Sequence, residues 1–314
     1  MTSSQSGSFR LFRVAGIQVL LHWSWLIVAG YQIATRGRAY DSMAWNVAEY
    51  LGLFAIVLMH EFGHALASRQ VGGEAKEILL WPFGGIAFVK VPPRPGAELW
   101  AIAAGPLVNV ALAPVLGLLF WQSLPVSLPS LLSDPPMFYR MAGAFSDETQ
   151  FLGILYHLNL LLLGFNLLPI YPLDGGQILR SLLWFGLGRG RSLQVASLLG
   201  FVGVAGLIVY AISEQSIFLG LMVLFLGQQC VAGWKHAKSL RALERVPRHR
   251  GFACPSCRQA PPGGPLWLCA ACGNRFDPFS TQAKCPHCLV AQPTTPCPHC
   301  GVSHPLERWS SGVE

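Results

Sequence analysis

The sequence predicts an α-helical, multi-pass membrane protein followed by a small metal-binding tail, and three observations support this fold class. Of the 314 residues, 52% are hydrophobic and only 12% are charged, whereas ordinary soluble domains have about 25% charged residues. Apolar windows long enough to cross a bilayer recur along the first 234 residues. After them, eight of the nine cysteines form four C-x-x-C pairs, a spacing typical of metal sites.

Six apolar windows predict about six transmembrane helices. No cleavable signal peptide is recognisable, so we expect the first window to remain as an anchor. After the second window, Leu80–Val89 is typical of a short strand or hairpin that turns at Gly84-Gly85, although an ordinary loop that closes the membrane face fits as well. The windows are Val19–Ala34, Val47–Ser68, Leu99–Gln122, Phe151–Ile170, Leu193–Ile212 and Ile217–Trp234.

The composition also predicts three parts of the chain. We expect a membrane-embedded domain over residues 1–234, a basic juxtamembrane linker over 235–250 and a cysteine-rich module over 251–304. If the N-terminus is inside, the loops on that side carry nine Lys and Arg residues before the tail, and the opposite loops carry three, namely Arg36, Arg38 and Arg140. Basic residues favour the cytoplasmic side. We therefore expect a protein of the cell membrane with both termini in the cytoplasm.

The second apolar window leads directly into the motif H-E-x-x-H at residues 60–64. On a helix this spacing places the imidazoles of His60 and His64 one turn apart on one face, as a zinc ion requires, with the carboxylate of Glu61 beside them. Ionisable groups are costly inside a membrane, which favours a functional site. Two satisfied core histidines with Glu61 as an ion-pair partner remain the alternative, because so short a motif also occurs by chance.

A third ligand must come from elsewhere, because a catalytic zinc takes three protein ligands and keeps a position for water. Asp174 is the most conspicuous acidic candidate. Pro169 and Pro172 interrupt the helix before it, and Gly175-Gly176 permit a tight turn. Irregular backbone at membrane depth is tolerated only where it is buried in protein or lines a wet cavity. An active-site loop is therefore favoured over a simple helix end.

Three motifs in this order resemble the site-2 protease family of intramembrane zinc metalloproteases. They are H-E-x-x-H at 60–64, Gly105-Pro-Leu-Val-Asn109 and N-x-x-P-x-x-P-L-D-G at 166–175. The resemblance covers about Phe9–Trp184. It implies hydrolysis of peptide bonds of transmembrane substrates, within the membrane or at its edge. It also implies that Glu61 is the general base that activates a zinc-bound water and later donates the proton, with His60, His64 and Asp174 as the zinc ligands.

Two asparagines are candidates for substrate binding. Asn109 and Asn166 carry carboxamides, which can hydrogen-bond a substrate backbone or a developing oxyanion. For Asn109, a bridge between neighbouring helices fits equally well. In members of the family, a segment similar to Leu80–Val89 is thought to offer an edge to an extended substrate.

The tail is basic, with ten Lys and Arg residues against four Asp and Glu from Lys235 onwards. Its first part should lie against anionic lipid headgroups. The C-x-x-C pairs are separated by 11, 12 and 8 residues and fit successive zinc ribbons with four thiolates each, similar to double zinc ribbon modules. Which pairs combine is open. The cysteines are Cys254, Cys257, Cys269, Cys272, Cys285, Cys288, Cys297 and Cys300.

Metal binding by these cysteines competes with disulfide formation, but a cytoplasmic position keeps thiols reduced. Four protein ligands leave no open position on zinc, so the tail's metals should support folding. We expect the tail to contact a cytoplasmic protein. Nucleic acid is disfavoured as a partner, because the ribbon segment has neither an arginine stripe nor an aromatic stacking series.

Three functions remain. The leading hypothesis is an intramembrane zinc endopeptidase that acts in regulated intramembrane proteolysis. The second is a catalytically silent protein that holds transmembrane clients, and the third is a metal transporter. An intact Glu61 argues against the second, and the scarcity of ligand-bearing residues along several spans argues against the third. We expect about three zinc ions per chain, one catalytic and two structural.

Overall fold

The computed structural model describes residues 7–35, 40–81, 84–125 and 145–309. The chain divides into two compact units. The first contains Met1–Gly186 and Val195–Gly233, and the second contains Leu187–Gln194 and Trp234–Glu314.

A four-stranded sheet with the order β1-β2-β3-β4 belongs to the first unit. β1 (Ser8–Val14) pairs antiparallel with β2 (Ile17–His22), β2 pairs parallel with β3 (Glu74–Trp81), and β3 pairs antiparallel with β4 (Gly84–Lys90). The β segment expected over Leu80–Val89 is therefore confirmed, as part of a larger sheet, but the turn predicted at Gly84-Gly85 is wrong, because both glycines belong to β4 and pair with Trp81 and Leu80 of β3. The other strands of the sheet come from the N-terminal region, and β4 is at one edge.

The apolar window Val19–Ala34 is not the single transmembrane helix that was predicted. Its first residues belong to strand β2, and α1 (Ser24–Thr35) has 12 residues. A helix of that length is about 18 Å long, whereas the hydrocarbon core of a bilayer is about 30 Å thick. Hydropathy measures apolar content only. Ile17 and Val19 of β2 are fully buried and belong to the same core cluster as Val57 and Ala65, so their apolar character serves the core of the sheet.

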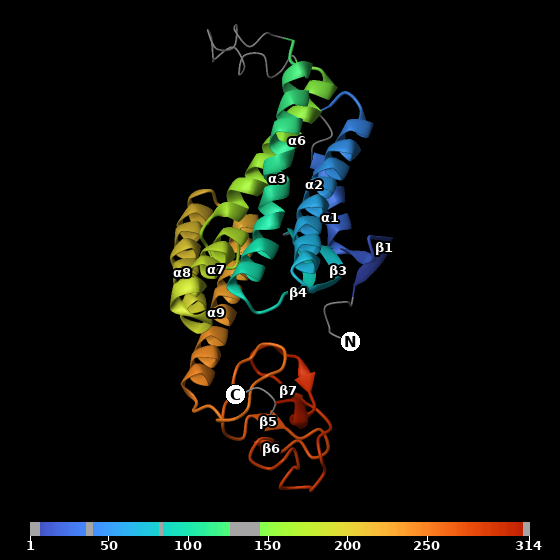
Figure 1. Ribbon diagram of the computed structural model, residues 1–314. Coiled ribbons are helices and arrows are strands. Elements are labelled where there is room, and N and C mark those ends of the chain that lie inside the picture. Colours follow the sequence, from blue (N-terminus) through green and yellow to red (C-terminus); the bar gives the residue numbers. More distant parts are fainter. Residues whose placement is uncertain (1–6, 36–39, 82–83, 126–144, 310–314) are drawn as a thin grey trace. The chain divides into compact units, whose positions relative to one another are not determined.

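Three long helices pack side by side (Figure 1), and the first of them also packs against β3 and β4. α2 (Met43–Gln70) begins after Ser42, whose hydroxyl accepts a hydrogen bond from the Ala44 N–H. α3 (Pro95–Ser123) has proline in its first turn, where a missing N–H costs nothing. α6 (Asp147–Leu167) is capped by Ser146. These three helices and α8 (Arg189–Ser213) are long and apolar enough to cross a membrane. A total of six spans is not established.

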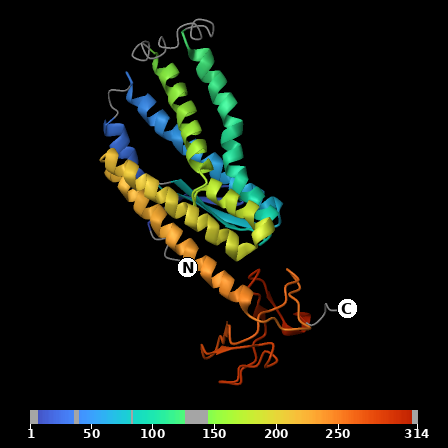
Figure 2. The ribbon, with the colours of Figure 1, turned by 90° about the vertical axis from the view of Figure 1, so that its left-hand side faces the viewer.

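The segment after α6 is irregular, as the prolines predict. α6 ends at Leu167, and α7 (Asp174–Leu187) begins at Asp174 itself. α8 and α9 (Ile217–Arg245) then run alongside one another (Figure 2) and pack through Val204, Leu226 and Cys230. α9 continues beyond Trp234, the end of the sixth predicted span, so the first part of the basic linker is helical.

The cysteine-rich part of the second unit contains two small antiparallel hairpins. The first joins β5 (Trp267–Leu268) to β6 (Arg275–Phe276), and the second joins β7 (Thr295–Pro296) to β8 (Ser303–His304). A short 3-10 helix follows at Leu306–Trp309. The core of this part consists of Trp267, Phe279 and Trp309 together with Cys254 and Cys297.

Candidate metal centre

His60 and His64 of α2 meet Asp174, the first residue of α7, inside the first unit. His60 Nε2 lies 3.1 Å from Asp174 Oδ2, and His64 Nε2 lies 3.4 Å from the same oxygen. The two Nε2 atoms are 3.0 Å apart. The helix provides the histidine spacing, and the break between α6 and α7 brings the carboxylate to them.

All three facing atoms are electron-rich. His64 Nδ1 lies 2.9 Å from the Ala101 carbonyl oxygen, and His60 Nδ1 lies 2.6 Å from Asn109 Oδ1. Each Nδ1 donates its hydrogen to that oxygen, so each neutral ring directs the lone pair of Nε2 towards Asp174. Three such atoms would repel one another unless a cation, or protons on the imidazoles, lay between them.

The distances fit a metal ion. Nitrogen and oxygen ligands of zinc lie about 2.0–2.1 Å from the ion in a tetrahedral arrangement, which places neighbouring ligand atoms about 3.3 Å apart. The three separations of 3.0, 3.1 and 3.4 Å are close to this value. Asp174 Oδ2 is also buried without a hydrogen-bond donor, as an oxygen reserved for a cation would be. Two histidines and one carboxylate leave the fourth position to water or substrate.

Gly105 of α3 makes room for this arrangement. A Cβ atom at residue 105 would lie 2.2 Å from His64 Nε2 and 2.8 Å from His60 Nε2. Real Cβ atoms do not approach other atoms so closely. The glycine is therefore required by the close approach of α3 to the facing imidazole nitrogens.

Glu61 lies beside the three-residue cluster and is buried. Its Oε2 accepts a hydrogen bond of 3.1 Å from the backbone N–H of Ala87 in β4. Gly85 of the same strand packs directly against it, because a Cβ at residue 85 would lie 2.2 Å from Glu61 Cγ. The strand therefore holds the Glu61 carboxylate in place through Oε2, and Oε1 takes no part in the hydrogen bond to Ala87.

The cluster opens into a cavity of about 490 Å³. His60, Glu61, His64 and Asp174 form its polar wall, and apolar side chains of β3, α6 and α9 form much of the rest. Asn166, a predicted substrate-binding residue, is half-buried and lines this cavity. Substrate binding by Asn166 therefore stays a prediction.

Asn109 does not fit the role of substrate or oxyanion ligand. Its side chain is completely buried, and both ends of its amide are engaged. The oxygen faces His60, and the nitrogen donates to Asn159 Oδ1 at 2.8 Å. Asn109 thus bridges α2 to α6, which corresponds to the alternative drawn from the sequence.

Three groups that hold the site were not found from the sequence. The Ala101 carbonyl and the Ala87 N–H are backbone groups, which leave no signal in residue identity. Asn159 could have been found from the sequence, because it is a polar side chain in an apolar helix, seven residues before Asn166. That spacing indicated a shared helix face but not the partner.

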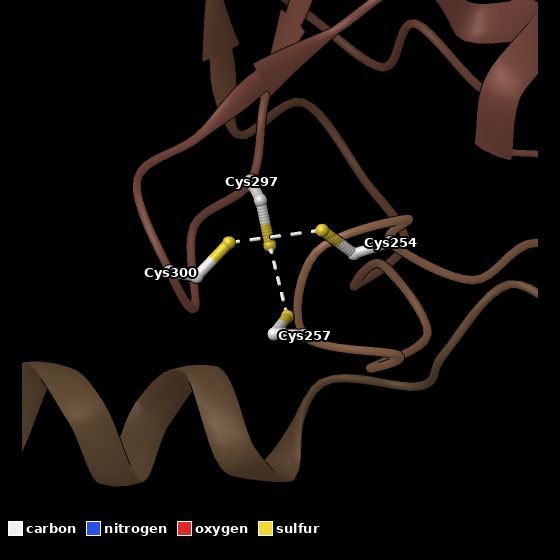
Figure 3. A group of neighbouring side chains, drawn as sticks. All are labelled: Cys254, Cys257, Cys297 and Cys300. Carbon is white, nitrogen blue, oxygen red and sulfur yellow. Dashed lines mark hydrogen bonds between the residues drawn. The ribbon is translucent and has the colours of Figure 1, made fainter. Parts of the chain in front are cut away.

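The tail cysteines form two further clusters. Cys254, Cys257, Cys297 and Cys300 surround one point, with Sγ–Sγ distances of 3.7 Å across the Cys254–Cys300 and Cys257–Cys297 pairs (Figure 3). Cys269, Cys272, Cys285 and Cys288 form the other, with 3.5 and 3.7 Å. Tetrahedral zinc with Zn–S of about 2.3 Å would place sulfurs about 3.8 Å apart. All eight are free thiols, so the disulfide alternative does not fit.

The pairing, which the sequence left open, is nested. The first C-x-x-C pair joins the fourth, and the second joins the third. The ends of the module come together because the Ala253 N–H donates to the Trp309 carbonyl at 2.9 Å, and because Trp309 is completely buried. The similar intervals between cysteine pairs could not distinguish the two pairings.

Residues 48–210 match the family described as Peptidase family M50. The chain is 31% identical over 222 residues to a zinc metalloprotease of Methanocaldococcus jannaschii, which covers 69% of this chain and 58% of that protein. It is 35% identical over 131 residues to stage IV sporulation protein FB of Bacillus subtilis, which covers 41% and 38%.

The fold is similar to that of the solved site-2 protease from Methanocaldococcus jannaschii. The TM-score is 0.50 with 27% sequence identity, and the match covers 72% of this chain and 95% of that structure. The chain spans about half the length of the curated relatives it matches, at 58% and 49% for two of them.

Proposed function

Because the chain belongs to peptidase family M50, we propose that it is a zinc endopeptidase that cuts peptide bonds of transmembrane proteins. One observation carries this proposal. His60 Nε2, His64 Nε2 and Asp174 Oδ2 lie within 3.0–3.4 Å of one another, beside a buried carboxylate and a cavity. These four side chains offer the ligands and the base that metal-assisted hydrolysis needs.

His60, His64 and Asp174 would hold the zinc. When bound, the ion would supply Lewis acidity, which lowers the pKa of a coordinated water to about 7 and polarises a peptide carbonyl. Glu61 takes the proton from the attacking water and later delivers it to the leaving amine. Its hydrogen bond from Ala87 keeps the carboxylate facing the cavity during both transfers.

Strand β4 supports an extended peptide as the bound form of the substrate. β4 is the last strand of the sheet in the described part of the chain, and its Ala87 N–H donates to Glu61, so an edge of the sheet lies beside the proposed catalytic carboxylate. An extended peptide can add to such an edge by main-chain hydrogen bonds. A helical transmembrane substrate must therefore unwind near its scissile bond. Asn166 lines the cavity and would hydrogen-bond the exposed backbone.

Two zinc ions would hold the nested cysteine clusters, in addition to one at the membrane site. With both termini in the cytoplasm, the tail would contact a cytoplasmic protein partner. The basic end of α9, including Lys235, Lys238 and Arg241, would lie near anionic lipid headgroups.

A reconstitution experiment tests the proposed function. The full chain is placed in lipid vesicles with a single-span candidate substrate, and cleavage by the wild type is compared with Glu61→Gln. We expect cleavage to fall by about 10²-fold or more, because proton transfer by a positioned side chain contributes at least that factor. Glu74→Gln, at an exposed position on β3, is the matched control and should cleave like the wild type.

Other outcomes would favour the alternatives. Cleavage that is unchanged in Glu61→Gln would exclude the proposed mechanism. Stable substrate capture without cleavage by the zinc-loaded wild type would support a client-binding protein, and zinc flux into the vesicles would support a transporter. The described part of the membrane unit contains one group of three close ligand side chains, which does not favour a transport path with successive sites.

A further inference from the structure

Asn159 has no role in the proposed chemistry, yet it is completely buried in the middle of α6. Its Nδ2 donates to the backbone carbonyl of Asn109 at 3.0 Å. Its Oδ1 accepts from Asn109 Nδ2 at 2.8 Å. Asn109 Oδ1 in turn lies 2.6 Å from His60 Nδ1. A line of hydrogen bonds therefore runs from α6 through α3 to a candidate metal ligand on α2.

The backbone carbonyl of Asn109 determines which group donates and which accepts in every hydrogen bond of this line. A backbone carbonyl can only accept, so the end of the Asn159 amide that faces it must be the NH₂ group. The Asn159 oxygen then faces Asn109, whose facing group must be its own NH₂. The Asn109 oxygen is left to face His60. His60 Nδ1 must therefore carry the hydrogen, and the lone pair is on Nε2.

We propose that Asn159 is a positioning residue that sets the tautomer of His60 through Asn109 and so prepares His60 Nε2 to bind the metal. The inference rests on the proposed function, because it assumes that the three-residue cluster binds zinc. Hydrogen-bond partners of metal-binding histidines fix ring orientation and tautomer in this way. Here the tautomer is set by the backbone carbonyl of Asn109, which is linked to His60 through the side chains of Asn159 and Asn109.

The competing explanation is that Asn159 only fastens α6 to α3. Thr149 is a suitable comparison, because it is also buried on α6 and its hydroxyl donates to the Ser123 carbonyl at 2.8 Å, at the end of α3. Thr149 touches neither histidine. Thr149→Val removes this hydrogen bond and the contact of the hydroxyl with Ser146 Oγ at 3.0 Å at the start of α6, so it reports the effect of weaker α6 attachment away from the two histidines.

The first measurement is the zinc affinity of the membrane site in the full chain, without substrate. Each variant is equilibrated with chelator buffers of set free zinc, and its zinc content is determined by elemental analysis. The same variant with His60→Ala is subtracted, which removes the zinc held by the tail. We expect Asn159→Leu to weaken binding by about 10–100-fold, the effect of losing such a partner. Thr149→Val should stay within about twofold of the wild type.

The second measurement removes the dependence on amide orientation. In Asn109→Asp both side-chain oxygens are acceptors, so His60 Nδ1 finds an acceptor whichever way the group is turned. Adding Asn159→Leu to this background should change the zinc affinity by less than about threefold, in contrast to the loss in the wild-type background. Lost packing would lower the affinity equally in both backgrounds.

The outcomes are distinct. If Asn159→Leu lowers the zinc affinity when residue 109 is Asn but not when it is Asp, the proposal is supported. An Asn159→Leu protein with wild-type affinity overturns it, and so does an equal loss in the two backgrounds or an equal loss in Thr149→Val. If His60→Ala does not reduce the zinc content of the otherwise wild-type chain, the proposed metal site itself is wrong. That result separates failure of the function from failure of the positioning role.

Discussion

Gly105 shows at the residue scale how closely the backbone of α3 approaches the candidate ligands. Its backbone leaves no space for a methyl group beside His64 Nε2 and His60 Nε2. The residue types that carry chemistry, two histidines and two carboxylates, could be recognised from the sequence because their identity is their signal. The need for glycine at this position depends on a neighbouring helix, and so only the structure reveals it.

We predict that Gly105→Ala disrupts the membrane metal site. The new methyl group would displace both imidazole nitrogens, and sites of this kind tolerate shifts of only about 0.5 Å. Zinc affinity at that site should fall by about tenfold or more, as measured by elemental analysis in chelator buffers. Gly164→Ala on α6 is the matched control, because a Cβ there meets nothing within 4 Å. Equal zinc binding by the two variants would contradict this account of Gly105.

At the element scale, the tail contains one carboxylate that joins several loops. Asp277 Oδ2 accepts from His249 Nε2 at 2.7 Å and from the Gly264 N–H at 2.8 Å, and Oδ1 accepts from the Phe279 N–H at 3.0 Å. Burial alone would raise the pKa of Asp277, but these hydrogen bonds and the nearby His249 outweigh it and hold the pKa below the usual range. The ionised carboxylate therefore stabilises the folded tail.

We predict that Asp277→Asn weakens these loops in a pH-dependent way. Because the pKa is lower in the folded tail than in the unfolded chain, the stabilisation is complete above the unfolded value of about 3.9 and disappears as the pH falls through the folded value. Near neutral pH the variant should lose roughly 2 kcal/mol. Hydrogen exchange of the Gly264 and Phe279 amides, compared at equal pH, measures this loss.

An internal reference is available in the same experiment. The Cys285 N–H donates to the Val290 carbonyl, away from Asp277, and its exchange should be the same in both proteins. A difference between wild type and variant that persisted well below the folded pKa would contradict the assignment to the ionised carboxylate.

Secondary structure was predictable where local pattern decides it. Two prolines before Asp174 and two glycines after it indicated the break between α6 and α7, and apolar content located α2, α3, α6 and α8. The prediction of a single transmembrane helix over Val19–Ala34 was wrong, because apolar content does not distinguish a strand from a helix. β2 is a strand because it pairs with β3, and these partners are more than fifty residues apart in the sequence.

On the scale of the whole chain, the nested cysteine clusters make a clear prediction for the tail. With zinc bound, Cys300→Ser should expose Cys254, Cys257 and Cys297 to alkylation, because they would share its site. Cys285 and Cys288 should stay protected, since a separate cluster holds them. Peptide mass spectrometry after mild alkylation identifies the labelled thiols. Successive ribbons would instead expose Cys285 and Cys288 together with Cys297.

Composition and local motifs were enough to identify the membrane class of the chain, the candidate zinc-binding residues with their spacing, and the metal-binding tail. These properties depend on composition and on residues close together along the chain. Three further properties became visible only in the folded chain: β2 joins the sheet, Asn109 is turned towards His60, and the cysteine pairs are nested. Each of these depends on contacts between distant segments, and the free energy of such contacts is not encoded in any local pattern.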